Sequence, residues 1–173
     1  MMAKSGLYLT AFALLSLCAL KPALAAEEPT LIGTYGVWKA YSHKDGGNPL
    51  CFMSATPQKA EGKYSKRGKI YAMIAHRPNE KSRDVFSYIA GYTYKDSADV
   101  TVTIGKDKFI LFGQGESAWT PSEDQDKRLA SAIQKGSTMV VEGMSARGTK
   151  TKDTFSLKGS GDAYAAISKA CGP

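Results

Sequence analysis

Two histidines and one serine are the first residues to test for catalysis, because a nucleophilic serine needs a histidine base and an acid. His43 and His76 occur without the spacing of a known triad. Ser145 lies in GMSARG, where Arg147 occupies the place of the second glycine of a G-x-S-x-G turn. We therefore predict no catalytic residue. One alternative stays open, a hydrolase in which His43 or His76 meets Ser145, Asp153 or another acid in a polar pocket.

The amino-terminal stretch has the pattern of a secretory signal. An uncharged apolar run at 7–20 is too short for an ordinary membrane-spanning helix. Ala23 and Ala25 then supply the small residues that signal peptidase requires. We expect residues 1–25 to be cleaved and residues 26–173 to form a single domain of an exported protein.

Cleavage would leave two cysteines, Cys51 and Cys171, in an oxidising compartment. An even pair in an exported chain predicts a disulfide, which here would close a loop over most of the mature chain. Such a loop stabilises the fold by about 5 kcal/mol at most. The pairing also argues against a thiol nucleophile built from Cys51 and His76, because that chemistry needs a free thiol.

The mature chain is moderately basic. The sequence has 23 basic and 16 acidic residues, and two of the basic residues lie in the leader, which leaves a net charge of +5. This excess favours anionic surfaces but is far from that of a dedicated nucleic-acid binder. GQGESA at 113–118 imitates a dinucleotide loop, but no helix begins within its glycines. The two histidines lack the spacing of metal ligands, so we expect no metal. We also expect no cofactor, no binding to nucleic acid, and no transmembrane segment in the mature chain.

Two clusters of cations and a row of tyrosines form the candidate binding surface. The cations lie in QKAEGKYSKRGK and in RGTKTKDTFSLK. The two clusters either belong to turns that are simply exposed to solvent, or form one surface that binds phosphorylated lipid headgroups or acidic partners. The tyrosines alternate on one predicted strand. They either form one wall of the core or provide an aromatic platform for a glycan or a partner protein. The candidate contact residues are Tyr88, Tyr92, Tyr94, Lys66, Arg67, Lys69, Arg147 and Lys150.

Alternation of apolar and polar residues predicts a mainly β protein. Clean alternation marks several strands, whereas 68–76 and 108–112 are apolar on both faces and so are typical of central strands. We expect an antiparallel β-sandwich or flattened barrel of about seven to nine strands, with one or two short α-helices. The remaining strand segments are 34–41, 50–54, 86–94, 98–104, 137–145 and 153–157.

Two segments predict the helices. Residues 120–136 contain Thr120 as the expected capping residue, followed by proline and, one residue later, by acids in the first turn. Residues 160–171 place Ile167 and Cys171 on one face. That face should pack inward, which favours a buried disulfide.

The order of several segments resembles the invasion-associated locus B (IalB) family, from about Trp38 to Cys171. The segments are KIYAMIAHRP, DVFSYIAGY, DVTVTIGKDKFILF and AIQKGSTMVVEGMSARGTKTKDTFSLKG. The most specific part is G-x-S-x-R-G-T-x-T-x-D-x-[FY]-S-L-x-G at Gly143–Gly159. The resemblance implies an exported envelope protein of alphaproteobacteria, from a family named for invasion of host cells. No catalytic residue or cofactor is established for the family, so none is carried over.

These observations together predict an exported, non-enzymatic protein of the periplasm or the outer surface. We expect it to bind an envelope or host-cell protein, a glycan or an anionic lipid surface, with peripheral membrane contact, and to contribute to invasion of host cells. The alternatives are a periplasmic hydrolase with a cryptic polar pocket and a chaperone-like helper of outer-membrane assembly.

Overall fold

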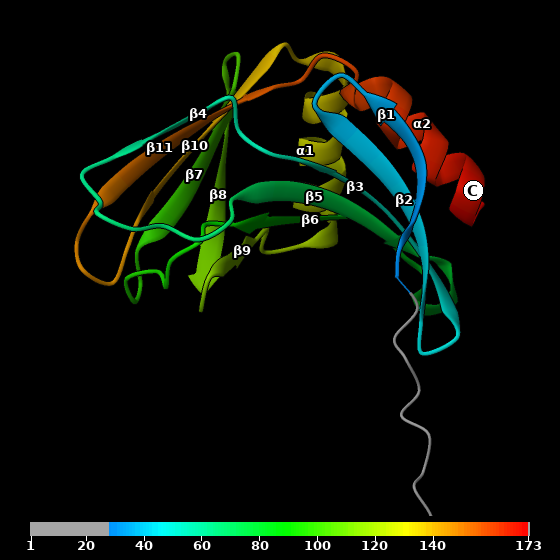
Figure 1. Ribbon diagram of the computed structural model, residues 1–173, viewed down its shortest axis with the longest axis horizontal. Helices are drawn as coiled ribbons and strands as arrows, with labels where there is room; N and C mark the ends of the chain where they lie inside the picture. Colours follow the sequence, from blue (N-terminus) through cyan, green and yellow to red (C-terminus); the bar gives the residue numbers. More distant parts are fainter. Residues whose placement is uncertain (1–27, 173) are drawn as a thin grey trace, which may run out of the picture.

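Within residues 28–172, eleven strands form one antiparallel sheet, and two α-helices pack on it (Figure 1). The computed structural model describes residues 28–172, so the predicted leader lies outside the described residues. In space the strands follow the order β1-β2-β3-β5-β6-β9-β8-β7-β10-β11-β4. The elements are β1 (Thr30–Tyr35), β2 (Trp38–Asp45), β3 (Asn48–Ala55), β4 (Lys59–Gly62), β5 (Tyr71–Arg77), η1 (Pro78–Glu80), β6 (Ser82–Ile89), β7 (Asp99–Ile104), β8 (Asp107–Gln114), β9 (Ser117–Trp119), α1 (Glu123–Lys135), β10 (Thr138–Met144), β11 (Lys150–Ser156) and α2 (Ser160–Cys171).

The sheet is strongly bent, so that its two halves face each other across the core. Four strands separate β6 from β11 in the sheet, yet the rings of Tyr88 and Phe155 meet at 6.2 Å. Trp38 in β2 donates a hydrogen bond from Nε1 to the carbonyl oxygen of Ser156 at 3.0 Å. Among the described residues β1 and β4 are the two edge strands and do not pair with each other, so the sheet is open and does not close into a barrel. The predicted mainly β, antiparallel class with short helices is confirmed.

The predicted strand count was too low because some strands are short or lie close together. Residues 34–41 do not form one strand, because a turn at Gly36 (φ +64°) separates β1 from β2 and pairs Tyr35 with Trp38. Glycine has no Cβ and adopts this left-handed conformation without strain. The strands β4 and β9 have only four and three residues, which is too few for a clear alternation.

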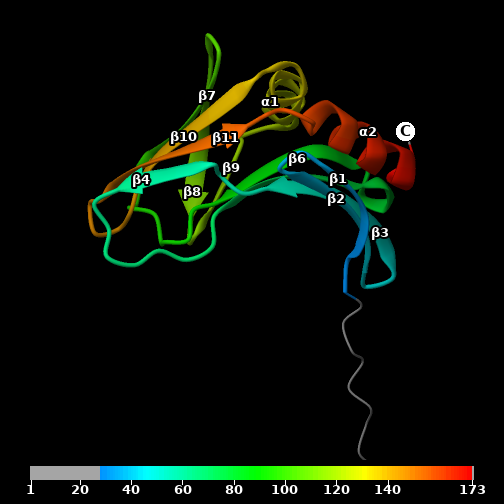
Figure 2. The same ribbon diagram turned by 45° about the horizontal axis from the view of Figure 1, so that its top comes forward.

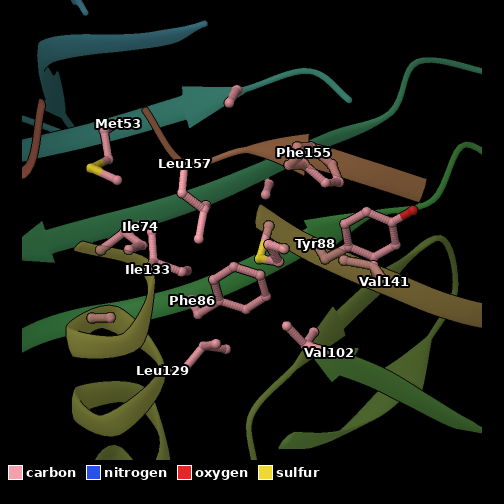
Figure 3. Close-up of a cluster of buried hydrophobic side chains, with 14 of the residues drawn as sticks. Met53, Ile74, Phe86, Tyr88, Val102, Leu129, Ile133, Val141, Phe155 and Leu157 are labelled. Carbon is pink, nitrogen blue, oxygen red and sulfur yellow. The ribbon is translucent and has the colours of Figure 1, made fainter. Parts of the chain in front are cut away.

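Side chains from both halves of the sheet and from α1 form the core (Figure 3). Phe86 in β6, Phe155 in β11 and Leu129 and Ile133 in α1 are all fully buried. Burial of one such side chain stabilises the fold by about 1.5–3 kcal/mol. The inward direction of Phe155 follows the alternation in the sequence.

Helix α1 begins later than the sequence predicts. Ser122 is the capping residue, and its Oγ accepts a hydrogen bond from the backbone N–H of Gln125 at 3.4 Å. The hydroxyl of Thr120, the predicted cap, instead donates to Oδ1 of Asp126 at 2.7 Å. The same carboxylate oxygen accepts the backbone N–H of Phe86 at 2.8 Å and so ties α1 to β6.

Helix α2 lies over β1, β2 and β3 (Figure 2) and is joined to β3 by the predicted disulfide. Cys51 and Cys171 are bonded with their Cα atoms 5.8 Å apart, across 120 residues of chain. Both cysteines are buried, so the pairing and the inward helix face are confirmed. Among residues 28–172 no helix has the length and apolar character needed to cross a membrane.

Strand β8 is not buried on both faces as predicted. Phe109 and Leu111 point into the core, whereas Ile110 and Phe112 are 45% and 51% exposed. In β5, likewise, only alternate residues are buried and the others are half-buried. The opposite half of the bent sheet and the helices cover one face of these strands, so apolar residues on the other face contact solvent.

Candidate functional site: a basic cavity beside a buried ion pair

A buried hydrogen-bond network joins Arg67, Asp153 and Tyr88. The guanidinium of Arg67 donates from Nη1 to Oδ1 of Asp153 at 2.8 Å and from Nη2 to Oδ2 at 2.7 Å. The Tyr88 hydroxyl donates to the same carboxylate, and Arg67 Nε donates to the carbonyl oxygen of Ala90 at 2.7 Å. The side chains of Arg67 and Asp153 are 4% and 0% exposed. This bidentate pair makes the arginine part of the core.

Three distant segments supply the network. Asp153 alternates with exposed lysines along β11 and so faces inward, opposite Tyr88 of β6. Arg67 lies in the β4–β5 connection, where the N–H of Gly68 donates to the carbonyl oxygen of Gly91 at 2.8 Å. Gly91 has φ +71°, and a Cβ there would lie 2.6 Å from the carbonyl oxygen of Gly68. The chain can close at this point only with glycine.

Burial and charge keep the phenols of this region neutral. Burial raises the pKa of Tyr88, and the neighbouring carboxylate of Asp153 raises it further. Burial also raises the pKa of Tyr92 and of Tyr94. Burial alone would lower the pKa of Arg67, but the hydrogen bonds to Asp153, together with the electrostatic effects of Tyr88 and Asp153 and the contact with Tyr64, outweigh it and the pKa is raised. The network therefore holds one balanced ion pair and offers no phenolate or free guanidine base near neutral pH.

A cavity of about 680 Å³ opens beside the network. It lies between the β4–β5 connection, the segment after β6 and the β10–β11 turn, which gather at the left of Figure 1. Lys63, Lys66 and Arg147 line it, together with one acid, Glu116. Within residues 28–172 none of these three cations forms an ion pair. We call this the basic cavity; Tyr64, Ser65, Arg67, Tyr92, Ser145 and Thr149 also line it.

Two tyrosine rings that line the cavity lie against the guanidinium of Arg67. The guanidinium carbon of Arg67 lies 5.4 Å from the ring centroid of Tyr64 and 5.0 Å from that of Tyr92. The hydroxyl groups of Tyr92 and Thr151 are hydrogen-bonded at 2.7 Å. Cation–π contacts of this kind hold the rings in place against the arginine.

The predicted row of tyrosines on a single strand is wrong. Strand β6 ends at Ile89, and the left-handed Gly91 turns the chain before Tyr92 and Tyr94. Tyr88 and Tyr94 are 1% and 4% exposed, so they belong to the core and present no surface platform. Tyr92 is half-buried and lines the basic cavity.

The predicted cations divide into three groups. Arg67 is held in the buried network and is unavailable as a surface charge. Lys66 and Arg147, one from each cluster of the sequence, are exposed and line the basic cavity. Lys69 and Lys150 are exposed but lie outside its lining. The structure thus brings part of the two clusters together.

His76 meets a serine other than Ser145 and an acid other than Asp153. Its Nε2 lies 3.2 Å from Oγ of Ser168, and its Nδ1 lies 3.9 Å from Oδ1 of Asp84. Nδ1 accepts the backbone N–H of Asp84 at 3.1 Å, which places the ring proton on Nε2. In this tautomer Nε2 donates to Ser168 and cannot take its proton, so the group does not have the arrangement of a catalytic triad.

The remaining catalytic candidates of the sequence do not converge either. Ser145 belongs to the β10–β11 turn, where its Oγ accepts the backbone N–H of Thr149 at 3.2 Å. Nδ1 of His43 is buried and has no hydrogen-bond partner among residues 28–172. Cys51 is in the disulfide and is no free thiol. In the described part of the chain no three His, Cys, Asp or Glu side chains gather as metal ligands would.

Sequence reasoning missed Tyr64 and Thr149 in the cavity and the structural role of Asp153. Asp153 has a signal, since it precedes the buried Phe155 by two residues and must share its face of β11. Tyr64 and Thr149 lie in connections, where no periodicity indicates direction. Only the fold places them beside the cations.

Comparisons with known proteins identify the family. The sequence model of the invasion associated locus B (IalB) protein family matches residues 38–168. Among solved structures, the crystal structure of invasion associated protein B from Bartonella henselae is similar, with a TM-score of 0.56 and 16% sequence identity, over 80% of this chain and 95% of that one. No curated protein sequence matches significantly. With three quarters of its length matched by the family model, the chain belongs to the IalB family.

Proposed function

We propose that this protein is an exported, non-enzymatic envelope protein that binds an anionic component of the bacterial envelope or of a host-cell surface. The basic cavity is the binding site. The observation that carries the proposal is that Lys66 and Arg147, distant in the sequence, line one cavity and form no ion pair with any acid of residues 28–172. Membership of the IalB family supports a part in invasion of host cells.

Unpaired cations in a concave site attract anions more strongly than the same charges on a flat surface. The low-dielectric walls focus the field, and solvent screens it less. Of the four charged residues that line the cavity apart from Arg67, three are cations and only Glu116 is an acid. Arg67 adds no net charge, because Asp153 neutralises it. The remaining excess of positive charge favours an anionic partner.

The test is a charge reversal within the cavity, with a matched reversal outside it. The Lys66→Glu/Arg147→Glu variant should lose salt-sensitive cosedimentation with lipopolysaccharide and with vesicles containing phosphatidylglycerol. The control, Lys106→Glu/Lys108→Glu, changes net charge equally in the β7–β8 hairpin, at the top of Figure 1 and away from the cavity loops. The control should bind as the unaltered protein does. Equal losses in the two variants would show that binding follows net charge alone and would refute the site.

Arg67 must be left intact in this experiment. Reversal of Lys66, Arg67 and Lys69 together would place a glutamate beside buried Asp153, and any loss of binding would then follow from unfolding. The partner itself can be captured in intact cells with a photo-crosslinking residue at Tyr64. Crosslinks to lipopolysaccharide or surface glycans support the proposal, whereas crosslinks confined to outer-membrane proteins would replace it with the helper role.

A further inference from the structure

We infer that the ligand of the basic cavity is an anionic saccharide, meaning a sugar chain that carries carboxylate, phosphate or sulfate groups. This inference rests on the proposed function and names the ligand class for the same site. Three features of the cavity support it: a held aromatic ring, a lining of hydroxyl groups beside an ordered turn, and the cations that form no ion pair within residues 28–172.

The aromatic ring is that of Tyr64, which is 37% exposed although both of its ends are held. Its hydroxyl donates to the carbonyl oxygen of Ala60 at 3.1 Å, and its ring lies 5.4 Å from the guanidinium carbon of Arg67. A sugar ring has an apolar C–H face that packs well on a flat aromatic surface with a polar rim. A simple inorganic anion would gain nothing from this ring.

Hydroxyl groups supply the polar contacts that a sugar needs. Ser65, Thr93 and Thr149 line the cavity, and each hydroxyl can both donate and accept a hydrogen bond, as sugar hydroxyls do. The β10–β11 turn is ordered before binding, since the N–H of Ser145 donates to the carbonyl oxygen of Thr149 at 2.9 Å. Arg147 belongs to this turn, so its attachment point is fixed and less entropy is lost on binding.

The cations distinguish an anionic sugar from a neutral one. Lys66 and Arg147 lie on connections that border the same cavity, so acid groups on successive sugar units can reach both. The volume of about 680 Å³ is within the range of small-ligand sites and exceeds what a single phosphate would fill. Free phosphate would therefore use the charges without the aromatic ring and would leave most of the cavity unfilled.

The test compares ligands and variants by calorimetric titration of the folded, disulfide-bonded protein. The probes are a heparin oligosaccharide, lipopolysaccharide, a neutral oligosaccharide of the same length and inorganic phosphate. We expect both anionic saccharides to bind at least tenfold more tightly than the neutral one and than phosphate. The two anionic arms distinguish a host-type glycan from a bacterial one. Tyr64→Ala should lower affinity about tenfold while the salt dependence stays, because stacking and charge act separately.

Failure of this inference differs from failure of the proposed function. If Tyr64→Ala binds the saccharides unchanged, or phosphate binds as tightly as they do, the ligand is no saccharide. The Lys66→Glu/Arg147→Glu variant would then still lose its binding to anionic vesicles. If that variant keeps all of its binding, the cavity is not the site and both proposals are overturned. Circular dichroism and a thermal melt of each variant confirm that it is folded.

Discussion

Removal of the charge of Asp153 tests whether the buried ion pair holds the two halves of the sheet together. In Asp153→Asn the side chain keeps its size, but Arg67 remains buried at 4% exposure without a counter-charge. The asparagine amide also takes the place of the carboxylate that accepts the hydrogen bond of the Tyr88 hydroxyl. Loss of one partner from a buried pair costs about 3–5 kcal/mol, because the other charge stays desolvated. That is a large part of the roughly 5–15 kcal/mol by which a domain is stable.

The assay is urea unfolding of the disulfide-bonded protein, followed by circular dichroism, with a matched control on the neighbouring strand. Glu61→Gln removes the acid of an exposed pair with Lys59, at 2.9 Å and with side chains 42% and 67% exposed. This control should change the free energy of unfolding by less than about 1 kcal/mol. A loss below about 1 kcal/mol for Asp153→Asn, similar to the control, would refute the role of the network.

Three further predictions concern the framework around the site. Reduction of the Cys51–Cys171 disulfide should lower the free energy of unfolding by about 3–5 kcal/mol, because it closes 120 residues of chain; an unchanged urea midpoint in reductant would contradict this. Burial, with the charge of Arg83 nearby, lowers the pKa of His76 in the folded protein. Because His76 therefore binds a proton more readily in the unfolded chain, the free energy of unfolding should fall as the pH drops below about 6.5. A urea midpoint that does not vary there, or that rises, would count against it. Gly91→Ala should lower the free energy of unfolding by about 1–3 kcal/mol more than Gly105→Ala, because Gly105 also has a positive φ but has open space around it. Equal thermal melts of the two variants would show that the close approach of Gly91 to Gly68 is unimportant.

The strands and the disulfide could be predicted because their signals are local or compositional. The alternation in ADVTVTI places Val100 and Val102 inward, as the structure confirms. The cysteine pairing followed from an even count of cysteines and from the expectation that the chain is exported. The exposure of Ile110 and Phe112 could not be predicted, because apolar residues on both faces are compatible with a buried strand, and only the arrangement of layers decides which face is covered.

The candidate site could be predicted only in part, because its parts are far apart in the sequence. Lys66 and Arg67 are neighbours in one basic run and look equivalent, yet one is exposed in the cavity and the other is buried. The difference depends on Asp153, which lies 86 residues away from Arg67. The local pattern of charges around Lys66 and Arg67 does not indicate which of the two is buried. The alternation along β11, which places Asp153 on the inward face, provides part of that information.

The most direct test of the account is to map a bound anionic saccharide on the protein by NMR. A heparin oligosaccharide titrated into labelled protein should shift the backbone amide signals of the cavity loops, foremost those of Tyr64, Gly68, Gly91 and Thr149. The β7–β8 turn should remain unchanged, although its lysines carry the same type of charge. Shifts confined to that turn, or spread evenly over exposed lysines, would contradict the central claim that the basic cavity is the binding site.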